Sequence, residues 1–193
     1  MNLFPVVWFA VGAFFASEVA LAMFKRARLG AADVQDRGSM RTLWAVIAGS
    51  VTLAVTAQRL GLGRIRFGGP WIPLLALALL LVGLAIRWAA IVSLGRFFTV
   101  DVAIHADHRV IQTGPYRFVR HPSYSGLLLA FLGVGVALGN WVSLLVLMVP
   151  ISIALAARIT TEERALHLAL GPEYGAYCAR TSRLVPAVFS SRR

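Results

Sequence analysis

The chain has 193 residues, of which 59% are hydrophobic and only 14% are charged, and its formal net charge is +11. A soluble domain is usually about half apolar and about one-quarter charged, so this composition excludes an ordinary soluble protein. Nucleic-acid binding is one explanation of the positive charge, but no basic, aromatic module lies outside the apolar segments. The preference of membrane proteins for basic cytoplasmic loops explains the charge better.

Cysteine and histidine usage argues against a disulfide and against a metal centre. The single cysteine, Cys178, rules out an internal disulfide and a cysteine-based metal cluster, and we interpret it as a small apolar filler. The four histidines lack the spacing of a zinc site. We therefore expect no metal.

Long uncharged runs predict membrane-spanning helices, because a bilayer core about 30 Å thick needs about 20 apolar residues of helix. The first span is predicted at about 4–24. It is interpreted as a retained helix rather than a cleaved signal peptide, because it lacks a basic segment before it and a convincing cleavage site. The loop 25–41 is rich in arginine and lysine, which predicts that it faces the cytoplasm. The second and third spans are predicted at about 42–60 and 70–92.

The apolar stretch 126–157 predicts a helical hairpin. As one helix it would be about 48 Å long at about 1.5 Å per residue, which is too long for a bilayer even with tilt. The sequence "LGN" at 138–140 supplies a break, since glycine and asparagine favour helix ends and tight turns. We expect arms at about 123–138 and 141–159, with a kink in the second arm at Pro150.

The predicted fold is an all-α integral membrane protein with five transmembrane helices, including the C-terminal helical hairpin, with the N-terminus outside and the C-terminus in the cytoplasm. Residues 1–69 form two N-terminal spans and their loops, and residues 70–193 form the functional core. Two polar segments, 93–122 and 158–193, flank the hairpin and are expected to build a small cytoplasmic cap at its base. In the first segment, "TVDVAI" and "RVI" predict a small β-hairpin around "HADH". In the second segment, "GP" at 171–172 predicts the end of one helix and the start of the next.

Charged residues gather at the base of the hairpin. Arg117 and Arg120 share a face if they lie on a helical turn, and His121 follows directly. On the second polar segment, Glu162 or Glu163 is predicted to face this cluster. The alternative is that these are ordinary interfacial charges, with nearby tyrosines as membrane anchors. The residues alone leave both interpretations open.

Two further charged residues lie inside predicted spans. Glu18 is isolated in the middle of the first span, and it is a candidate for lining a substrate path because an intramembrane acid is by default a functional hypothesis. Arg87, near the inner end of the third span, is interpreted as structural or as snorkelling to the interface.

The order of motifs from 83 to 186 carries a family resemblance. It comprises "LGRFFT", "H-x-V-I-x-x-GPYRFVRHPSYSG", "EE-x-x-L", "GPEYGAY" and "R-L-V-P". This set resembles the isoprenylcysteine carboxyl methyltransferase family and its bacterial and archaeal relatives, which are related to phospholipid methyltransferases. The usual "H-x-L-V" of that family reads "H-R-V-I" here, a departure that backbone contacts tolerate.

The resemblance implies a membrane methyltransferase that uses S-adenosyl-L-methionine, held in a cytoplasm-facing pocket, while a lipid-side tunnel admits a lipophilic small molecule or a lipidated substrate. The cofactor-binding residues implied by the resemblance are His108, Arg109, Val110, Ile111, Gly114, Tyr116, His121, Tyr124 and Glu162 or Glu163. The implied catalytic residues are Arg120, His121 and Arg183, of which the two arginines are candidates for holding a substrate carboxylate. Arg120, Tyr174 and Glu18 are the candidates on the substrate side.

The methyl acceptor stays open at this point. Carboxyl O-methylation of an isoprenylcysteine-like or other lipophilic acid is the first hypothesis, and phospholipid N-methylation or thiol S-methylation is the second. Membrane reductases of the sterol type, which use NADPH, have a similar C-terminal region, and a non-catalytic membrane protein is the last alternative. The expected location is a bacterial inner membrane with the active site facing the cytoplasm, in contact with membrane lipids and not with nucleic acid.

Overall fold

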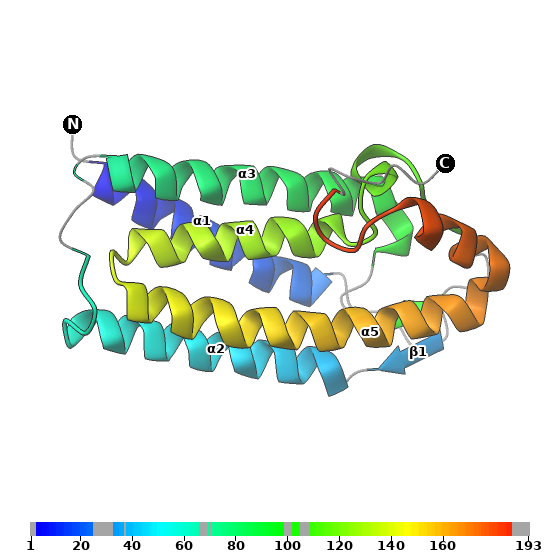
Figure 1. Ribbon diagram of the computed structural model, residues 1–193, viewed down its shortest axis with the longest axis horizontal. Helices are drawn as coiled ribbons and strands as arrows, with labels where there is room; N and C mark the ends of the chain where they lie inside the picture. The colour runs from blue at the N-terminus through cyan, green and yellow to red at the C-terminus, as the bar shows by residue number, and fades with distance from the viewer. Residues whose placement is uncertain are drawn as a thin grey trace.

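A computed structural model describes residues 3–24, 33–36, 38–65, 69, 71–98, 102–104 and 109–186. Five helices run alternately in opposite directions along one long axis (Figure 1). They are α1 (Phe4–Phe24), α2 (Gly38–Arg59), α3 (Trp71–Leu94), α4 (Pro122–Ala137) and α5 (Trp141–Arg180). The predicted all-helical, multi-span architecture is thereby confirmed.

Four of these helices, α1, α2, α3 and α5, are long and apolar enough to cross a membrane. The fifth, α4, is apolar but has only 16 residues. It nevertheless lies inside the bundle, between α3 on one side and α5 on the other (Figure 1). The count of five complete spans therefore stays a prediction, because α4 is shorter than a bilayer core requires.

The predicted hairpin turn at 138–140 is confirmed. Gly139 adopts a φ of +61°, and Asn140 then caps α5, its side-chain oxygen accepting a hydrogen bond from the Ser143 amide at 2.9 Å. The loop after α2 packs on this turn, since the Trp141 amide donates to the Gly63 carbonyl at 3.1 Å. The turn thus joins two pairs of helices at one end of the bundle.

Helix α5 continues well past the apolar arm, to Arg180. Its backbone leaves helical geometry inside the element at Gly171, where φ is 53° and ψ is −130°, and this confirms the break predicted at 171–172. Pro150 lies within α5 and the helix continues through it. The last part of α5 therefore turns away from the bundle axis and returns toward the start of α4 (Figure 1).

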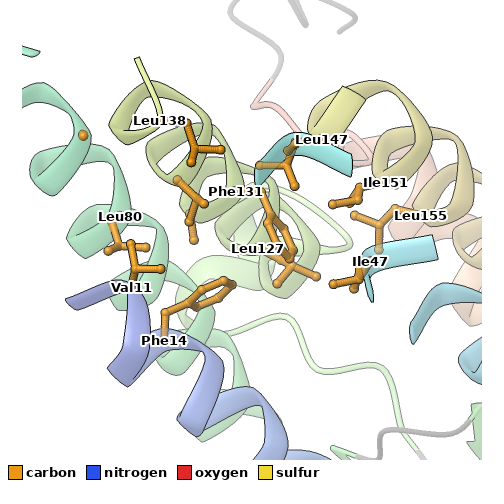
Figure 2. Close-up of a cluster of buried hydrophobic side chains, with 14 of the residues drawn as sticks. Val11, Phe14, Ile47, Leu80, Leu127, Phe131, Leu138, Leu147, Ile151 and Leu155 are labelled. Carbon is orange, nitrogen blue, oxygen red and sulfur yellow. The ribbon is translucent and has the colours of Figure 1, made fainter. Parts of the chain in front are cut away.

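Helix α4 forms the centre of the apolar core (Figure 2). Phe131 of α4 meets Phe14 of α1 edge to face, with ring centroids 5.3 Å apart, and both side chains are buried. On the other side of α4, Leu147 and Ile151 of α5 and Ile47 of α2 complete the cluster. The central position of α4 means that its orientation is fixed by helices from both halves of the chain.

The predicted β-hairpin in the polar connector is wrong. Strand β2 (Val102–Ile104) pairs antiparallel with β1 (Asp33–Asp36), from the loop after α1, with Asp33 opposite Ile104. The "RVI" segment at 109–111 has no strand assignment. The extended propensity of "VAI" was read correctly, but β-pairing partners can lie far apart in sequence, and the partner here comes from the opposite half of the chain.

Candidate functional site

Two polar stretches that flank the hairpin meet at one end of the bundle. The short 3₁₀ helix η2 (Gly114–Arg117) leads into the first turn of α4, and the chain after α5 runs beside it. The Arg120 amide donates to the Ser182 carbonyl at 2.8 Å, and the His121 amide donates to the Arg183 carbonyl at 3.0 Å. Val119 and Ser182 form a parallel β-bridge. The backbone itself therefore brings Arg120, His121 and Arg183 together.

Glu163 of α5 lies at the centre of this cluster. Its Oε1 accepts from Arg120 Nε at 2.8 Å and lies 3.3 Å from His121 Nε2, while its Oε2 accepts from Arg183 Nε at 2.9 Å. Burial opposes ionisation of this carboxyl group, but hydrogen bonds from His121, Arg120 and Arg183 outweigh it and lower the pKa of Glu163 to about 2. The carboxylate therefore stays ionised and holds three groups from separate segments. The predicted contact between an α5 glutamate and this cluster is confirmed.

Arg120 is held from several sides. Besides its bond to Glu163, its Nη1 donates to the carbonyl of Cys178 at 2.9 Å and to that of Thr181. These carbonyls belong to the last turn of α5 and to the residue after it, which lack helical partners. Arg120 thus ties the connector to the C-terminal end of α5. Arg183 is more accessible, with 58% of its side chain exposed.

A second carboxylate, Glu162, lies beside the first and is more open. Its side chain is 30% exposed against 9% for Glu163. The Tyr124 hydroxyl donates to Glu162 Oε2 at 2.8 Å and accepts from Arg158 Nε at 2.9 Å. The Tyr124 ring stacks on the His121 ring with centroids 5.7 Å apart. The two neighbouring glutamates therefore have different surroundings: the buried Glu163 bonds to Arg120 and Arg183, and Glu162 keeps a solvent-facing part.

Three tyrosines close the polar end. The Tyr177 hydroxyl donates to the Tyr116 carbonyl at 2.7 Å, and burial raises the pKa of Tyr177 to about 12. Tyr174 is also buried, and among the residues that the structure describes its hydroxyl has no nitrogen or oxygen partner, only the weakly hydrogen-bonding Cys178 thiol. Burial raises the pKa of Tyr174 as well. A buried hydroxyl without a strong protein partner is unusual and leaves room for a bond to a ligand group.

The remaining predicted residues are placed as follows. Arg109, Val110 and Ile111 lie on the connector leading to η2, Gly114 is the first residue of η2, and Arg180 Nη2 of α5 donates to Gln112 on the connector at 3.1 Å. His108 lies outside the described residues.

Arg117 does not join the cluster around Glu163, although a shared face with Arg120 was predicted. It is exposed and lies over the Phe118 ring at 5.1 Å. The predicted helical turn ends between the two arginines, because η2 stops at Arg117, so Arg120 points in another direction.

The interpretation of Glu18 as isolated is wrong, and of the two interpretations of Arg87 the structural one agrees with its contacts whereas snorkelling does not. The Arg87 guanidinium forms a two-pronged ion pair with the Glu18 carboxylate across α1 and α3, and both side chains are buried. Arg87 Nη1 also donates to Ser123 Oγ at 2.8 Å. The pair was missed because two lone charges 69 residues apart carry no local signal.

Glu18 and Arg87 share the wall of a pocket with Tyr124. The pocket lies between α1, α2, α3 and α4 and contains about 510 Å³ of space between atoms, including its open mouth. Its other lining side chains are Phe, Leu, Ile, Ala, Met and Trp. Tyr124 therefore contacts both sites: its side chain lines this largely apolar pocket, and its hydroxyl bonds Glu162 at the polar end.

Comparisons with known proteins agree with the motif pattern. Residues 75–168 match the isoprenylcysteine carboxyl methyltransferase (ICMT) family. Protein-S-isoprenylcysteine O-methyltransferase B of Arabidopsis thaliana is 35% identical over 120 residues, which are 61% of this chain and 61% of that protein. Protein-S-isoprenylcysteine O-methyltransferase of Schizosaccharomyces pombe is 36% identical over 115 residues, covering 58% of this chain and 49% of that protein. The matched regions thus span no more than about 61% of the length of these curated relatives.

A solved structure shares the fold. The eukaryotic intramembrane Ras methyltransferase ICMT superposes with a TM-score of 0.59 at 21% sequence identity, over 79% of this chain and 54% of that one. This likeness concerns the arrangement of helices. Residues 75–168 are, independently of this, similar in sequence to the isoprenylcysteine carboxyl methyltransferase family.

Proposed function

We propose that this protein is a membrane methyltransferase that uses S-adenosyl-L-methionine to methylate the carboxylate of an isoprenylcysteine-like or other lipophilic acid. The observation that carries the proposal is the cluster around Glu163, which is linked to a largely apolar pocket through Tyr124: its ring stacks on His121 of the cluster and lines the pocket. Cations able to hold a carboxylate thus lie near a pocket whose largely apolar lining suits a hydrocarbon group. The names of the matching relatives support the same activity.

The residues present fit the cofactor by their chemistry. Glu162 offers a partly exposed carboxylate, which suits the ammonium group or the ribose hydroxyls of a nucleoside amino acid. Tyr174 offers a buried hydroxyl that has no nitrogen or oxygen partner in the described part of the protein. The connector that includes Arg109 to Ile111 would add backbone groups. When bound, the cofactor supplies an electrophilic methyl group on a positively charged sulfur.

Methylation of a carboxylate needs no general base, because the acceptor is already an anion. The protein must instead bring two reactants together, and good positioning alone can lower the barrier by about 7–11 kcal/mol. Arginine grips a carboxylate through two parallel hydrogen bonds. Arg183 also contacts Glu163 through its Nε and Nη2, but it is the better placed for this contact because 58% of its side chain is exposed, whereas Arg120 is held by Glu163 and by two backbone carbonyls.

His121 acts through position rather than through proton transfer. It is buried, its Nε2 lies 3.3 Å from Glu163 Oε1, and its Nδ1 lies 4.0 Å from Glu162 Oε1. The ring therefore sits between the two carboxylates and stacks on Tyr124. In this role the His121 ring holds the Glu163 carboxylate toward Arg120 and Arg183, and the Glu162 carboxylate toward solvent.

The proposed orientation places the polar cluster on the cytoplasmic side of a bacterial inner membrane. Helix α1 ends and α2 begins at the same end of the bundle as the cluster (Figure 1), and the sequence that connects them is basic, as is typical of cytoplasmic loops. The acceptor then reaches the site from the membrane, through the apolar pocket. This arrangement keeps a lipophilic acceptor out of water while the site remains open to a water-soluble cofactor.

A methyl-transfer assay in detergent tests the proposal. Purified protein is given S-adenosyl-L-methionine labelled in its methyl group, together with a prenylcysteine acid, phosphatidylethanolamine or a thiol in parallel reactions. We expect label on the prenylcysteine acid in a base-labile ester, and a loss of at least about tenfold in Arg183→Gln. Label only on the amine or the thiol would contradict carboxyl methylation, and binding of NADPH without binding of S-adenosylhomocysteine would contradict methyl transfer altogether.

A further inference from the structure

The buried ion pair between Glu18 and Arg87 lies in an apolar part of the bundle, where charges are costly. Each side chain is at most 9% exposed, and the two residues come from α1 and α3. A buried ion pair adds little stability on its own, because apolar residues of similar volume usually give an equally stable protein. Ionisable groups within membrane helices typically have a functional reason. Stability alone therefore does not explain the pair.

Arg87 carries the influence of the pair onto the first turn of α4. Its Nη1 donates to Ser123 Oγ at 2.8 Å and to the Ser123 carbonyl at 3.3 Å. Ser123 lies two residues after His121 and directly before Tyr124. With Nε and Nη2 fixed on Glu18, the guanidinium plane has one orientation, and Nη1 then points at α4. The pair thus sets the position of the helix turn that carries His121 and Tyr124.

The same pair forms part of the pocket wall. Glu18, Arg87 and Tyr124 line one cavity whose other lining side chains are apolar apart from the indole of Trp44. If Glu18 were neutral, the Arg87 charge would face this cavity without compensation. The guanidinium would then turn toward another acceptor, and its hold on Ser123 would change. The effect would reach Tyr124, which lines the pocket and bonds to Glu162.

We propose that Glu18 and Arg87 are positioning residues for methyl transfer: their ion pair orients the first turn of α4, so that His121 and Tyr124 face the acceptor correctly. This inference rests on the proposed function and adds a residue from the N-terminal helix to it. The pair touches neither the cluster around Glu163 nor its cations, so it acts through Ser123.

Two variants separate positioning from a structural role. In Glu18→Gln the charge is removed while size and shape are kept. In the double variant Glu18→Leu/Arg87→Leu both charges are replaced by apolar groups, which is expected to restore the thermal midpoint to that of the parent or above. We expect kcat to fall at least tenfold in both variants, with a smaller change in KM. Ser17→Ala, which removes the α1 hydroxyl bonded to the Phe14 carbonyl, serves as the matched control and is expected to keep the parent kcat.

A structural pair predicts a different outcome. It predicts that the double variant regains both the thermal midpoint and kcat, and this result would overturn the inference. A second measurement needs no turnover: protein labelled with 3-fluorotyrosine is examined by ¹⁹F NMR, with the Tyr124 signal identified by its loss in Tyr124→Phe. We expect that signal to shift in Glu18→Gln and in the double variant, and a signal at the parent position in both would also overturn the inference. If the parent protein methylates no acceptor, the proposed function fails. The ¹⁹F result then decides by itself whether the Glu18–Arg87 pair sets the position of Tyr124.

Discussion

At the scale of single residues, Glu163 determines how the polar end is assembled. One carboxylate bonds to Arg120, to His121 and to Arg183, which come from the connector and from the C-terminal segment. Removing a charge from such a group leaves its partners uncompensated, and this typically costs about 3–5 kcal/mol. Glu163 is therefore the residue whose replacement the structure tolerates least at this site.

The low pKa of Glu163 gives a pH test. A carboxyl group whose pKa is lowered by folding stabilises the protein above its ordinary value of 4.5, and this contribution is lost as the pH falls toward about 2. We expect Glu163→Gln to lower the free energy of unfolding by about 3 kcal/mol at pH 7, and the gap between parent and variant to narrow below about pH 4.5. Thermal unfolding in detergent from pH 7 to pH 3 measures this. Glu173→Gln, which changes an exposed carboxylate, is the control and should change the free energy of unfolding at pH 7 only slightly. A difference for Glu163→Gln that stays large down to pH 3 would refute the assignment.

Two neighbouring tyrosines offer a matched comparison. Tyr177→Phe removes the donor to the Tyr116 carbonyl, and leaving a buried acceptor unbonded costs about 1–3 kcal/mol. Tyr174→Phe removes a hydroxyl with no nitrogen or oxygen partner among the described residues, so stability should change by less than about 0.5 kcal/mol. If the Tyr174 hydroxyl bonds to bound cofactor, calorimetry should show weaker binding of S-adenosylhomocysteine to Tyr174→Phe. Equal loss of stability in the two variants would contradict this reading of the site.

At the scale of helices, α3 and α4 touch through glycine. A Cβ placed on Gly83 would lie 2.6 Å from the Gly126 carbonyl oxygen, and one on Gly126 would lie 2.5 Å from the Gly83 carbonyl oxygen. Neither neighbour is the flexible end of a side chain, so the helices themselves would have to separate. Small residues at helix contacts are typical of membrane proteins, where close backbone approach drives association.

Gly83→Ala is therefore expected to destabilise the bundle by about 1–3 kcal/mol, because overpacking must be relieved by moving α3 away from α4. Gly49→Ala in α2 is the control, since nothing lies within 4 Å of a Cβ there. Alanine favours helix over glycine by about 0.5–1 kcal/mol, so the control should be neutral or slightly more stable. Thermal midpoints of the two variants check this. A stable Gly83→Ala variant would mean that α3 and α4 pack less closely than described.

The break within α5 depends on Gly171. Gly171 has φ 53° and ψ −130°, a conformation that L-residues avoid, and it directs the last part of α5 back toward Arg120. We expect Gly171→Ala to weaken binding of S-adenosylhomocysteine at least tenfold, because it displaces Tyr174 and Tyr177 from the connector. Gly175→Ala, four residues later on the same helix, has free space for its Cβ and should bind as the parent does. Unchanged binding of S-adenosylhomocysteine to Gly171→Ala would show that the helix break at Gly171 does not position the binding site.

At the scale of the whole molecule, the polar cluster and the hairpin turn lie at opposite ends of the bundle (Figure 1). The proposed orientation puts the cluster in the cytoplasm. In a Cys178→Ser background, single cysteines at Leu62, in the loop packed on the hairpin turn, and at Glu173, at the polar end, report the two ends. Both positions are exposed. In intact cells, a membrane-impermeant maleimide should label the cysteine at 62 and spare that at 173 until the membrane is permeabilised. The reverse pattern would invert the orientation.

Much of the architecture is determined by local sequence. Apolar length predicts α1, α2 and α3, and the turn at 138–140 follows from glycine and asparagine, because these signals depend on neighbouring residues only. The break at Gly171 is of the same kind, since a glycine followed by a proline ends a helix wherever it stands. The contact of an α5 glutamate with Arg120 could also be predicted, because two segments that flank a hairpin must meet at its base.

Only the tertiary structure determines the contacts between segments that are distant in sequence. Sequence alone left Glu18 unpaired, joined Arg117 to Arg120, and paired β2 with the wrong segment, and it did not separate the roles of Glu162 and Glu163. Each of these depends on the rotation of one helix against another, or on which loop reaches a strand edge. Hydrophobicity and turn propensity do not encode such relations, since they are set only when side chains far apart in the chain pack into one bundle.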